Sequence, residues 1–452
     1  MIVCKFGGTS VADPEAISRA AGIVQERLDR QPIVVVSALG GATNALLGLA
    51  EQASRGQLIG ALRAVQNLRD RHLTTAAALL PDGDAEISEE LSGMFDELAS
   101  LAEALSVLGH STPRSLDTVA AFGESLSSIM CAAAFRRLGI PAEHVDARTV
   151  MITDDQFTRA EPQPEAIAEA CRQHLLPLIR DGKVPVLGGY IGSTAKGSIT
   201  TTLGRGGSDY SASLIGAAVK AESIEIWTDV DGMLTADPRV VSGAYTIDQV
   251  GFEEASELAS FGAKVLHPYT IAPAVRIGIP VCVLNSRNPK GKGTLITFNA
   301  PKRPVTAIAG KSSVTVVKVR SPRMLLTEGF MRELFGIFER HHTSVDVVAT
   351  SEVSVSVTVD DGSRLDELVG DLRQLGDVAI EQRRGIVALV GAGLSESGPA
   401  MSRALKAIGD CRLHMLSLSA TGINLTMVVD GDEVNPLMQR LHAEFFEQGS
   451  RS

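Results

Sequence analysis

The chain has 452 residues, of which 44% are hydrophobic and 21% are charged, a balance typical of a soluble globular protein with about three domains. The 42 basic and 53 acidic residues give a net charge of -11, which argues against a general nucleic-acid surface. The 5 cysteines are scattered and lack CxxC spacing, which argues against a disulfide framework or a zinc site and favours a cytoplasmic protein.

Neither a signal peptide nor a membrane span is expected. Lys5 ends the apolar run at the start of the chain, which is too short for a signal peptide. The uncharged run 31–50 is long enough to suggest a membrane span, but Pro32 and the pair Gly40-Gly41 divide it. This run therefore predicts a strand, a turn and the start of a helix.

Short β-branched runs alternate with helical segments through residue 298. Strands are expected at residues 2–6, 33–37, 142–146, 184–187, 223–227 and 280–284, with a closing edge strand at 291–297. Helices are expected at residues 15–28, 118–138, 164–179, 208–219 and 252–261. Residues 57–110 are rich in Ala, Leu and Glu and predict a helical insertion. The alternation predicts an α/β sandwich with a mainly parallel sheet.

A linker and two smaller units follow. Residues 299–304 contain two prolines in a polar stretch, which is typical of a linker. One β-α-β-β-α-β set is expected at residues 314–319, 328–340, 344–350, 353–359, 365–375 and 378–381. A second set is expected at residues 386–391, 400–408, 412–417, 422–429 and 433–446. The pattern is a repeat of structure with little identity in sequence.

The first strand runs into the segment KFGGTS at residues 5–10. Glycines let the main chain approach a ligand, and clustered backbone N–H groups suit phosphate oxygens. Asp13 and Pro14 then predict the start of a helix. Taken alone, the segment fits an ordinary strand-turn-helix with a solvated Lys5 equally well.

Further motifs change that balance. They are GYIG (189–192), TTTLGRGGSDY (200–210), WTDVDG (227–232), DPR (237–239), FGE (122–124), FGAKVLHP (261–268) and TSEVS (350–354). In this order they resemble the aspartate kinase family, namely its monofunctional, lysine-sensitive type. The resemblance runs through nearly the whole chain.

The resemblance implies a fold and an assembly. Residues 1–298 would form the three-layer α/β/α sandwich of the amino acid kinases, followed by the linker 299–304. Two ferredoxin-like (βαββαβ) ACT domains would follow. The first, 313–384, would be nested in the second, which comprises 305–312 and 385–452. Exposed edges of the ACT sheets predict a homodimer, or a tetramer built from such dimers.

The implied activity is that of an ATP:L-aspartate 4-phosphotransferase, the first step towards lysine, threonine and methionine. The chain has no Walker A sequence and no protein-kinase HRD or DFG motif, which excludes those phosphate-binding designs. Lys5 would face the transferred phosphoryl group. Asp209 would orient Lys5, although an acid at that position also suits an ordinary helix N-terminus.

Aspartate presents two carboxylates and an ammonium. Arg205 can clamp the α-carboxylate with a bidentate fork, and Glu124 can take the ammonium. The family resemblance adds further substrate contacts at Thr43, Tyr190 and Ser208.

The resemblance implies nucleotide contacts along several segments. These are Lys5, Gly7, Gly8, Ser10, Thr228, Asp229, Leu234, Arg239 and Lys264. At Leu234 the lysine-sensitive relatives often carry tyrosine. Mg²⁺ would be carried by the ATP phosphates, without a metal site of the protein itself.

An amino-acid effector would bind where two ACT domains meet. Its expected contacts are Met324, Thr327, Gly329, Phe330, Met331, Ser344, Val345, Asp346, Thr350, Ser351 and Glu352. A carboxylate at such a seam, Asp346, should require a cation such as an ammonium. Lysine is the expected effector and threonine the alternative. A seam whose polar residues bind no ligand would show the same pattern.

Two rival functions remain open. Another amino acid kinase would phosphorylate glutamate, N-acetylglutamate, carbamate or UMP, but such relatives generally lack paired ACT domains. An amino-acid sensor without turnover would work through its ACT domains alone. The intact set Lys5, Glu124, Arg205 and Asp209 argues against this sensor.

Overall fold

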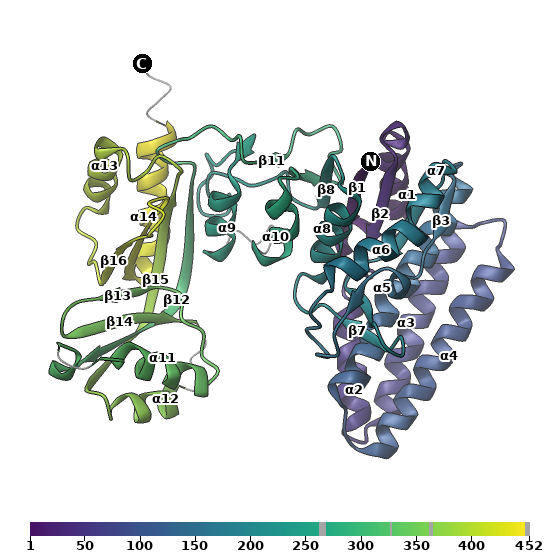
Figure 1. Ribbon diagram of the computed structural model, residues 1–452, viewed down its shortest axis with the longest axis horizontal. Helices are drawn as coiled ribbons and strands as arrows, with labels where there is room; N and C mark the ends of the chain where they lie inside the picture. Colours follow the sequence, from purple (N-terminus) through teal and green to yellow (C-terminus); the bar gives the residue numbers. More distant parts are fainter. Residues whose placement is uncertain (262–267, 326–327, 361–364, 448–452) are drawn as a thin grey trace. The chain divides into compact units, whose positions relative to one another are not determined.

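The computed structural model describes residues 1–261, 268–325, 328–360 and 365–447 (Figure 1). The chain forms two compact units. Unit 1 comprises Met1–Gly232 and Val265–Phe298, and unit 2 comprises Met233–Lys264 and Asn299–Ser452. The catalytic domain was expected to comprise residues 1–298. Its segment 233–264 instead belongs to unit 2, together with the C-terminal part of the chain.

The sheet of unit 1 is largely parallel. Its strands run in the order β3 (Ala142–His144), β5 (Val184–Gly188), β2 (Pro32–Val36), β1 (Ile2–Phe6), β8 (Ser223–Thr228), β10 (Val281–Asn285) and β11 (Thr294–Ile296). The β10–β11 pair is antiparallel, and the other pairs are parallel. This confirms the strands expected from the sequence, including the one at 291–297, which is observed as Thr294–Ile296.

Helices cover both faces of this sheet. They are α1 (Pro14–Gln25), α5 (Pro113–Arg137), α6 (Pro164–His174), α7 (Leu176–Arg180), α8 (Gly207–Val219) and α10 (Pro268–Ile277). The expected helix 164–179 is two helices, with Pro177 in the first turn of the second. Helix α10 was not expected from the sequence.

Alternation along β1 decides which side chain meets which layer. Cys4 and Phe6 pack in one core cluster with residues of α1 and α5. Val3 faces the other layer, since a Cβ at Gly216 of α8 would lie 3.8 Å from it. Because side chains alternate along a strand, Lys5 points to the α8 side.

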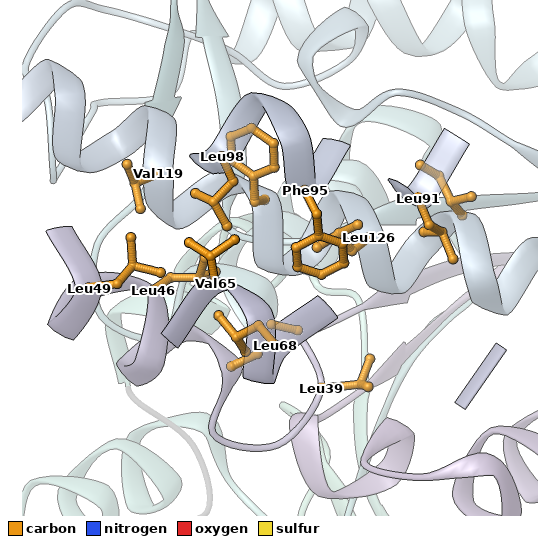
Figure 2. Packing of buried hydrophobic residues seen from close by; sticks show 14 of the residues in the cluster. Leu39, Leu46, Leu49, Val65, Leu68, Leu91, Phe95, Leu98, Val119 and Leu126 are labelled. Carbon is orange, nitrogen blue, oxygen red and sulfur yellow. The ribbon is translucent and has the colours of Figure 1, made fainter. Parts of the chain in front are cut away.

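The insertion consists of long helices. Helices α2 (Ala42–Ser54), α3 (Leu58–Leu79) and α4 (Ala85–Leu108) pack together with α5 around a second core cluster. Figure 2 shows Leu46, Val65, Phe95 and Leu126 in this cluster. Residues 57–110, which were expected to be helical, thus contain α3 and α4.

Helix α5 is central to unit 1. It is the one helix in the described part of the chain that is long and apolar enough to cross a membrane, by length and composition alone. However, 89% of its apolar stretch is buried inside the protein. Burial of this kind is typical of a core helix.

A small sheet was missed by the sequence analysis. Strands β4 (Ile152–Thr153), β6 (Ile191–Thr194) and β7 (Thr200–Thr202) form it in unit 1. These strands are short and rich in Thr, Ser and Gly, so they carry no apolar alternation.

Unit 2 contains one continuous sheet. The strands run in the order β13 (Val348–Thr350), β14 (Ser354–Val359), β12 (Ala307–Arg320), β15 (Asp377–Val390), β17 (Asn424–Asp430) and β16 (Met415–Leu418). Its helices are α9 (Phe252–Ser260), α11 (Phe330–Arg340), α12 (Leu365–Leu372), α13 (Gly398–Ile408) and α14 (Val434–His442). A short strand, β9 (Gln249–Val250), precedes α9.

The two expected β-α-β-β-α-β sets share β12 and β15. Strand β15 joins two strands that were expected separately, at 378–381 and 386–391, and β12 extends the strand expected at 314–319 back to Ala307, so each continues through both sets. Register shifts between Ser312 and Val316 mark the change from one set to the other. Such bulges turn a strand without ending it. The strand expected at 344–350 is shorter and begins at Val348.

Candidate active site

A cavity of about 770 Å³ lies beside the carboxyl ends of β1 and β2 in unit 1. It brings together all residues expected to act in phosphoryl transfer or to contact aspartate. These are Lys5, Thr43, Glu124, Tyr190, Arg205, Ser208 and Asp209. The residues come from a strand, three helices and two loops that are distant in sequence.

Lys5 and Asp209 form an ion pair in this cavity. Lys5 Nζ lies 2.6 Å from Asp209 Oδ1. The described residues offer Asp209 Oδ1 no other hydrogen-bond partner, so this oxygen is held by the Lys5 ammonium. A side chain on Gly7 would begin 3.6 Å from the ammonium, so glycine leaves that space open. The ammonium group of Lys5 thus lines the cavity.

Glu124 is 4% exposed and lies on α5. Burial raises the pKa of its carboxyl to about 8, although hydrogen bonds and the charge of Lys5 act in the opposite direction. Its Oε2 has no hydrogen-bond partner in the part of the chain that the structure describes. A buried carboxyl oxygen without a partner, at the wall of a cavity, is suited to receive an ammonium group.

Two motif glycines allow close packing around the cavity. A Cβ at Gly123 would lie 2.9 Å from Ala38 Cβ, so glycine lets α5 approach the loop after β2. A Cβ at Gly207 would lie 2.5 Å from Tyr190 Cδ2. Both positions explain why the motifs FGE and GRGGSD carry glycine beside their charged residues.

Arg205 stands in the turn before α8. It lies between Gly204 and Gly206, whose φ angles of 74° and 73° favour glycine. The Arg205 side chain is exposed, and the described residues offer it no ion pair. A guanidinium with free donors at a cavity wall can bind a carboxylate in a bidentate manner.

The sequence analysis missed Asp117, which also lines the cavity. Its side chain is 1% exposed and accepts hydrogen bonds from Thr202 Oγ1 at 2.6 Å, Thr202 N at 3.1 Å and Thr158 N at 2.9 Å. Burial raises the pKa of Asp117 against these hydrogen bonds. No motif distinguishes this acid from any other near the start of a helix.

Comparisons with known proteins agree with this geometry. The amino acid kinase family matches residues 1–285. The lysine-sensitive aspartokinase 3 of Escherichia coli (strain K12) is 39% identical over 456 residues, which cover 99% of this chain and 99% of that protein. The chain belongs to the aspartokinases of the amino acid kinase family. The family expected from the motifs is confirmed.

Solved structures extend the comparison to the fold. The crystal structure of E. coli aspartokinase III in complex with aspartate and ADP has a TM-score of 0.84 at 39% identity and covers 99% of this chain and 100% of that one. The structure of E. coli aspartokinase III in complex with lysine and aspartate also has a TM-score of 0.84, at 38% identity, with 99% of each chain covered. The expected fold class, an α/β kinase domain followed by ACT-like domains, is confirmed.

The expected nucleotide contacts in unit 1 lie along β1 and β8. Gly7 N donates to Trp227 O at 2.9 Å, and Ser10 Oγ lies 2.8 Å from Ser286 Oγ. Gly8 lines the cavity. Thr228 ends β8, and its hydroxyl donates to Asp229 Oδ1 at 3.2 Å. The loop after β1 is thus tied to the end of β8, while the role of these residues stays a prediction.

The other expected nucleotide contacts lie in unit 2 or outside the described residues. Leu234 pairs with Thr246 in an isolated bridge. The guanidinium of Arg239 is 87% exposed and binds Asp237 at 2.7 Å, which lowers the pKa of that carboxyl. Lys264 lies outside the described residues. These assignments stay predictions.

The expected effector residues lie around α11 and β13. Phe330 is buried in the core, and Met324, Met331 and Val345 pack against the same cluster. Gly329 precedes α11 with a φ of 84°. Ser344 and Glu352 are exposed. Thr350 is the last residue of β13, and Ser351 Oγ lies 2.7 Å from Ser354 Oγ. Thr327 lies outside the described residues.

Asp346 already has a cation within its own chain. Lys311 Nζ lies 3.4 Å from Asp346 Oδ2 and also contacts Asp360. Burial raises the pKa of Asp346, the neighbouring Asp360 adds to this, and Lys311 opposes it. An effector ammonium would therefore compete with Lys311 for this carboxylate.

Proposed function

We propose that the cavity around Lys5 is the active site of an aspartate kinase. The enzyme transfers the γ-phosphoryl group of ATP to the side-chain carboxylate of L-aspartate and yields 4-phospho-L-aspartate, the first step towards lysine, threonine and methionine. The observation that carries this proposal is the 2.6 Å Lys5–Asp209 pair in the same cavity as Glu124 and Arg205. The E. coli relative solved with aspartate and ADP supports this pair of ligands.

The reaction needs positioning and charge stabilisation more than covalent help. A carboxylate oxygen of aspartate attacks the γ-phosphorus, and the bond from that phosphorus to the oxygen of ADP breaks. Lys5 meets the charge on the transferred group, and Asp209 holds the ammonium in place. Arg205 binds the α-carboxylate and Glu124 the α-ammonium, so the side chain of aspartate is directed to the phosphoryl group.

ATP brings Mg²⁺ on its own phosphates in this proposal. The described residues contain no group of three or more His, Cys, Asp or Glu side chains that could hold a metal. Mg²⁺ commonly keeps several waters and binds through substrate phosphates, so a dedicated protein site is not required.

Lysine is the proposed inhibitory effector. The E. coli relative carries "lysine-sensitive" in its name, and one of its structures contains lysine. The loop before α11 and the segment with Asp346 would hold the amino acid, with Asp346 receiving its ammonium in place of Lys311. Threonine is the alternative effector, because recognition of an α-ammonium does not select the side chain.

The proposed assembly is a cytoplasmic homodimer formed through the ACT domains, or a tetramer of such dimers. Strands β13 and β16 lie at the two edges of the unit 2 sheet, and edge strands present unpaired backbone groups. Residues 313–384 would form the first ACT domain, and 305–312 with 385–452 the second. The kinase domain would extend to residue 298.

A coupled assay for ADP release tests the proposal directly. Aspartate is offered beside glutamate, N-acetylglutamate, carbamate and UMP, and only aspartate should give turnover. Turnover with another acceptor alone would indicate a different amino acid kinase. Binding of an amino acid by calorimetry without turnover of any acceptor would indicate a sensor.

A further inference from the structure

Asp117 links the two groups that are proposed to hold aspartate. It lies on α5, the helix that also carries Glu124. Its carboxylate accepts two hydrogen bonds from Thr202, at 2.6 Å and 3.1 Å. Thr202 ends β7, three residues before Arg205. One buried carboxylate thus ties the helix of the ammonium-binding acid to the turn of the carboxylate-binding arginine.

The same carboxylate fixes the turn from a second direction. Thr158 N donates to Asp117 Oδ2 at 2.9 Å, and Thr158 has a φ of 72°, an uncommon value for a residue other than glycine. A Cβ at Gly204 would lie 3.3 Å from Thr158 O. The loop that Asp117 holds is therefore in close contact with the glycine beside Arg205.

Thr202 also connects to Tyr190. Strands β6 and β7 place Ile191 opposite Thr202, and Leu203 N donates to Tyr190 O at 3.0 Å. Tyr190 lines the cavity together with Asp117. The hydrogen bonds at Thr202 therefore also help to fix the position of Tyr190 at the cavity.

We propose that Asp117 is a positioning residue for aspartate binding. Its carboxylate holds Thr202 and Thr158, and these two residues in turn hold the turn that carries Arg205. The ammonium and the α-carboxylate of an amino acid share one carbon atom, so the groups that bind them must keep a fixed separation. A buried carboxylate with three hydrogen bonds supplies that fixed link, whereas a surface loop would not. The inference rests on the proposed active site.

The chain offers a matched pair of threonines for the test. Thr201 and Thr202 are both 0% exposed and adjacent on β7. The hydroxyl of Thr202 donates to Asp117, whereas that of Thr201 lies 2.7 Å from Thr153 Oγ1. Thr202→Val and Thr201→Val each remove one buried hydroxyl, and only the first removes a bond to Asp117.

The experiment measures KM for aspartate, KM for ATP, kcat and Tm for Asp117→Asn, Thr202→Val and Thr201→Val in the full chain. Asp117→Asn and Thr202→Val should each raise KM for aspartate about tenfold or more, since hydrogen bonds to charged groups are strong. KM for ATP should change much less. Thr201→Val should leave KM for aspartate near that of the unaltered chain, even where Tm falls.

A double variant tests whether Asp117 and Thr202 act through the same interaction. Asp117→Asn combined with Thr202→Val should raise KM for aspartate by less than the product of the two single effects, because the Thr202 hydroxyl acts on the turn through its bond to Asp117. Equal KM ratios in all three single variants, with losses confined to Tm, would show a merely structural role and overturn the inference.

Failure of the proposed active site gives a different result. Glu124→Gln should raise KM for aspartate whatever Asp117 does. If it raises KM while Asp117→Asn and Thr202→Val do not, only the role of Asp117 is wrong. If the unaltered chain shows no aspartate-dependent turnover, the proposed function and this inference both fall.

Discussion

Lys5 Nζ lies 2.6 Å from Asp209 Oδ1, and the two side chains are 10% and 16% exposed. The lysine is the penultimate residue of β1 in a largely parallel sheet, and the aspartate lies in the first turn of α8. Alternation along β1 directs Lys5 to the layer that contains α8, so the fold itself creates the pair. A largely buried ammonium held by one carboxylate is well placed to meet the charge of a phosphoryl group.

Lys5→Ala should lower kcat by about 10²–10³ while binding of aspartate is largely kept. The expected loss corresponds to the effect of removing one preorganised donor from a transition state, about 3–4 kcal/mol. Steady-state kinetics and calorimetry with aspartate measure the two quantities. Lys183→Ala is the matched control, since Lys183 is 45% exposed and pairs with Glu143 at 3.0 Å. An unchanged kcat in Lys5→Ala would remove Lys5 from the mechanism.

Arg205→Lys should raise KM for aspartate about tenfold and leave KM for ATP nearly unchanged. An ammonium is a point charge and does not reproduce the bidentate contact of a guanidinium with a carboxylate. Initial rates with each substrate varied in turn give both constants. Arg172→Lys serves as control, because Arg172 is exposed and pairs with Glu169 on its own helix. A rise confined to KM for ATP would assign Arg205 to the nucleotide.

Aspartate binding should release protons near neutral pH. The pKa of Glu124 is raised to about 8, so at pH 7 its carboxyl is largely protonated before aspartate binds. An incoming ammonium favours the ionised form, hence binding should expel a proton. KM for aspartate should therefore fall as pH rises towards about 8 and then level off. Binding enthalpies in buffers of different ionisation enthalpy count the protons released.

Glu124→Gln is the control for this proton release. The variant should bind aspartate more weakly and release no proton at any pH between 6.5 and about 8. A pH dependence of KM that persists in Glu124→Gln would mean that another group titrates.

Asp346→Ala should relieve inhibition by lysine and leave kcat unchanged. Asp346 lies in unit 2, and its proposed role is to bind the effector ammonium in place of Lys311, which lies 3.4 Å away. Inhibition depends on the difference in effector affinity between two states of the enzyme, about 1–3 kcal/mol. Activity measured against increasing lysine gives the midpoint of inhibition for each variant.

Two further variants test the competition with Lys311. Lys311→Met removes the internal cation, so lysine should inhibit at a lower concentration than in the unaltered chain. Asp366→Ala changes an exposed acid at the start of α12 and should leave the midpoint unchanged. If Asp346→Ala is inhibited at the same lysine concentration as the unaltered chain, Asp346 is not part of an effector site.

The sequence predicted the main sheet of unit 1 because its strands carry strong local signals. The five residues of β1 are all buried and β-branched, apolar or amphipathic, and the expected range agrees with the observed one. The family resemblance predicted that Glu124, Arg205 and Asp209 belong to one site, and in the structure all three line the same cavity. Burial of Glu124 and its raised pKa depend on packing across the whole unit, which no local pattern records.

Other features follow from tertiary contacts alone. Strands β6 and β7 are short and polar, and the hydrogen bonds of Asp117 to Thr202 help to define where β7 ends. The sequence predicts only part of the long strand β12 and divides β15 into two strands, because Ser312 and Arg383 interrupt the apolar pattern. The ion pair between Lys311 and Asp346 joins positions 35 residues apart in sequence, so only the sheet brings them together.

The most direct test of the central claim measures ADP release as a function of aspartate concentration, for the unaltered chain and for Lys5→Ala in parallel. The account predicts saturable, aspartate-dependent ADP release that is lost almost entirely in Lys5→Ala and declines as lysine is added to the unaltered chain. ADP release that is independent of aspartate, or equal in the two proteins, would contradict an aspartate kinase built around Lys5.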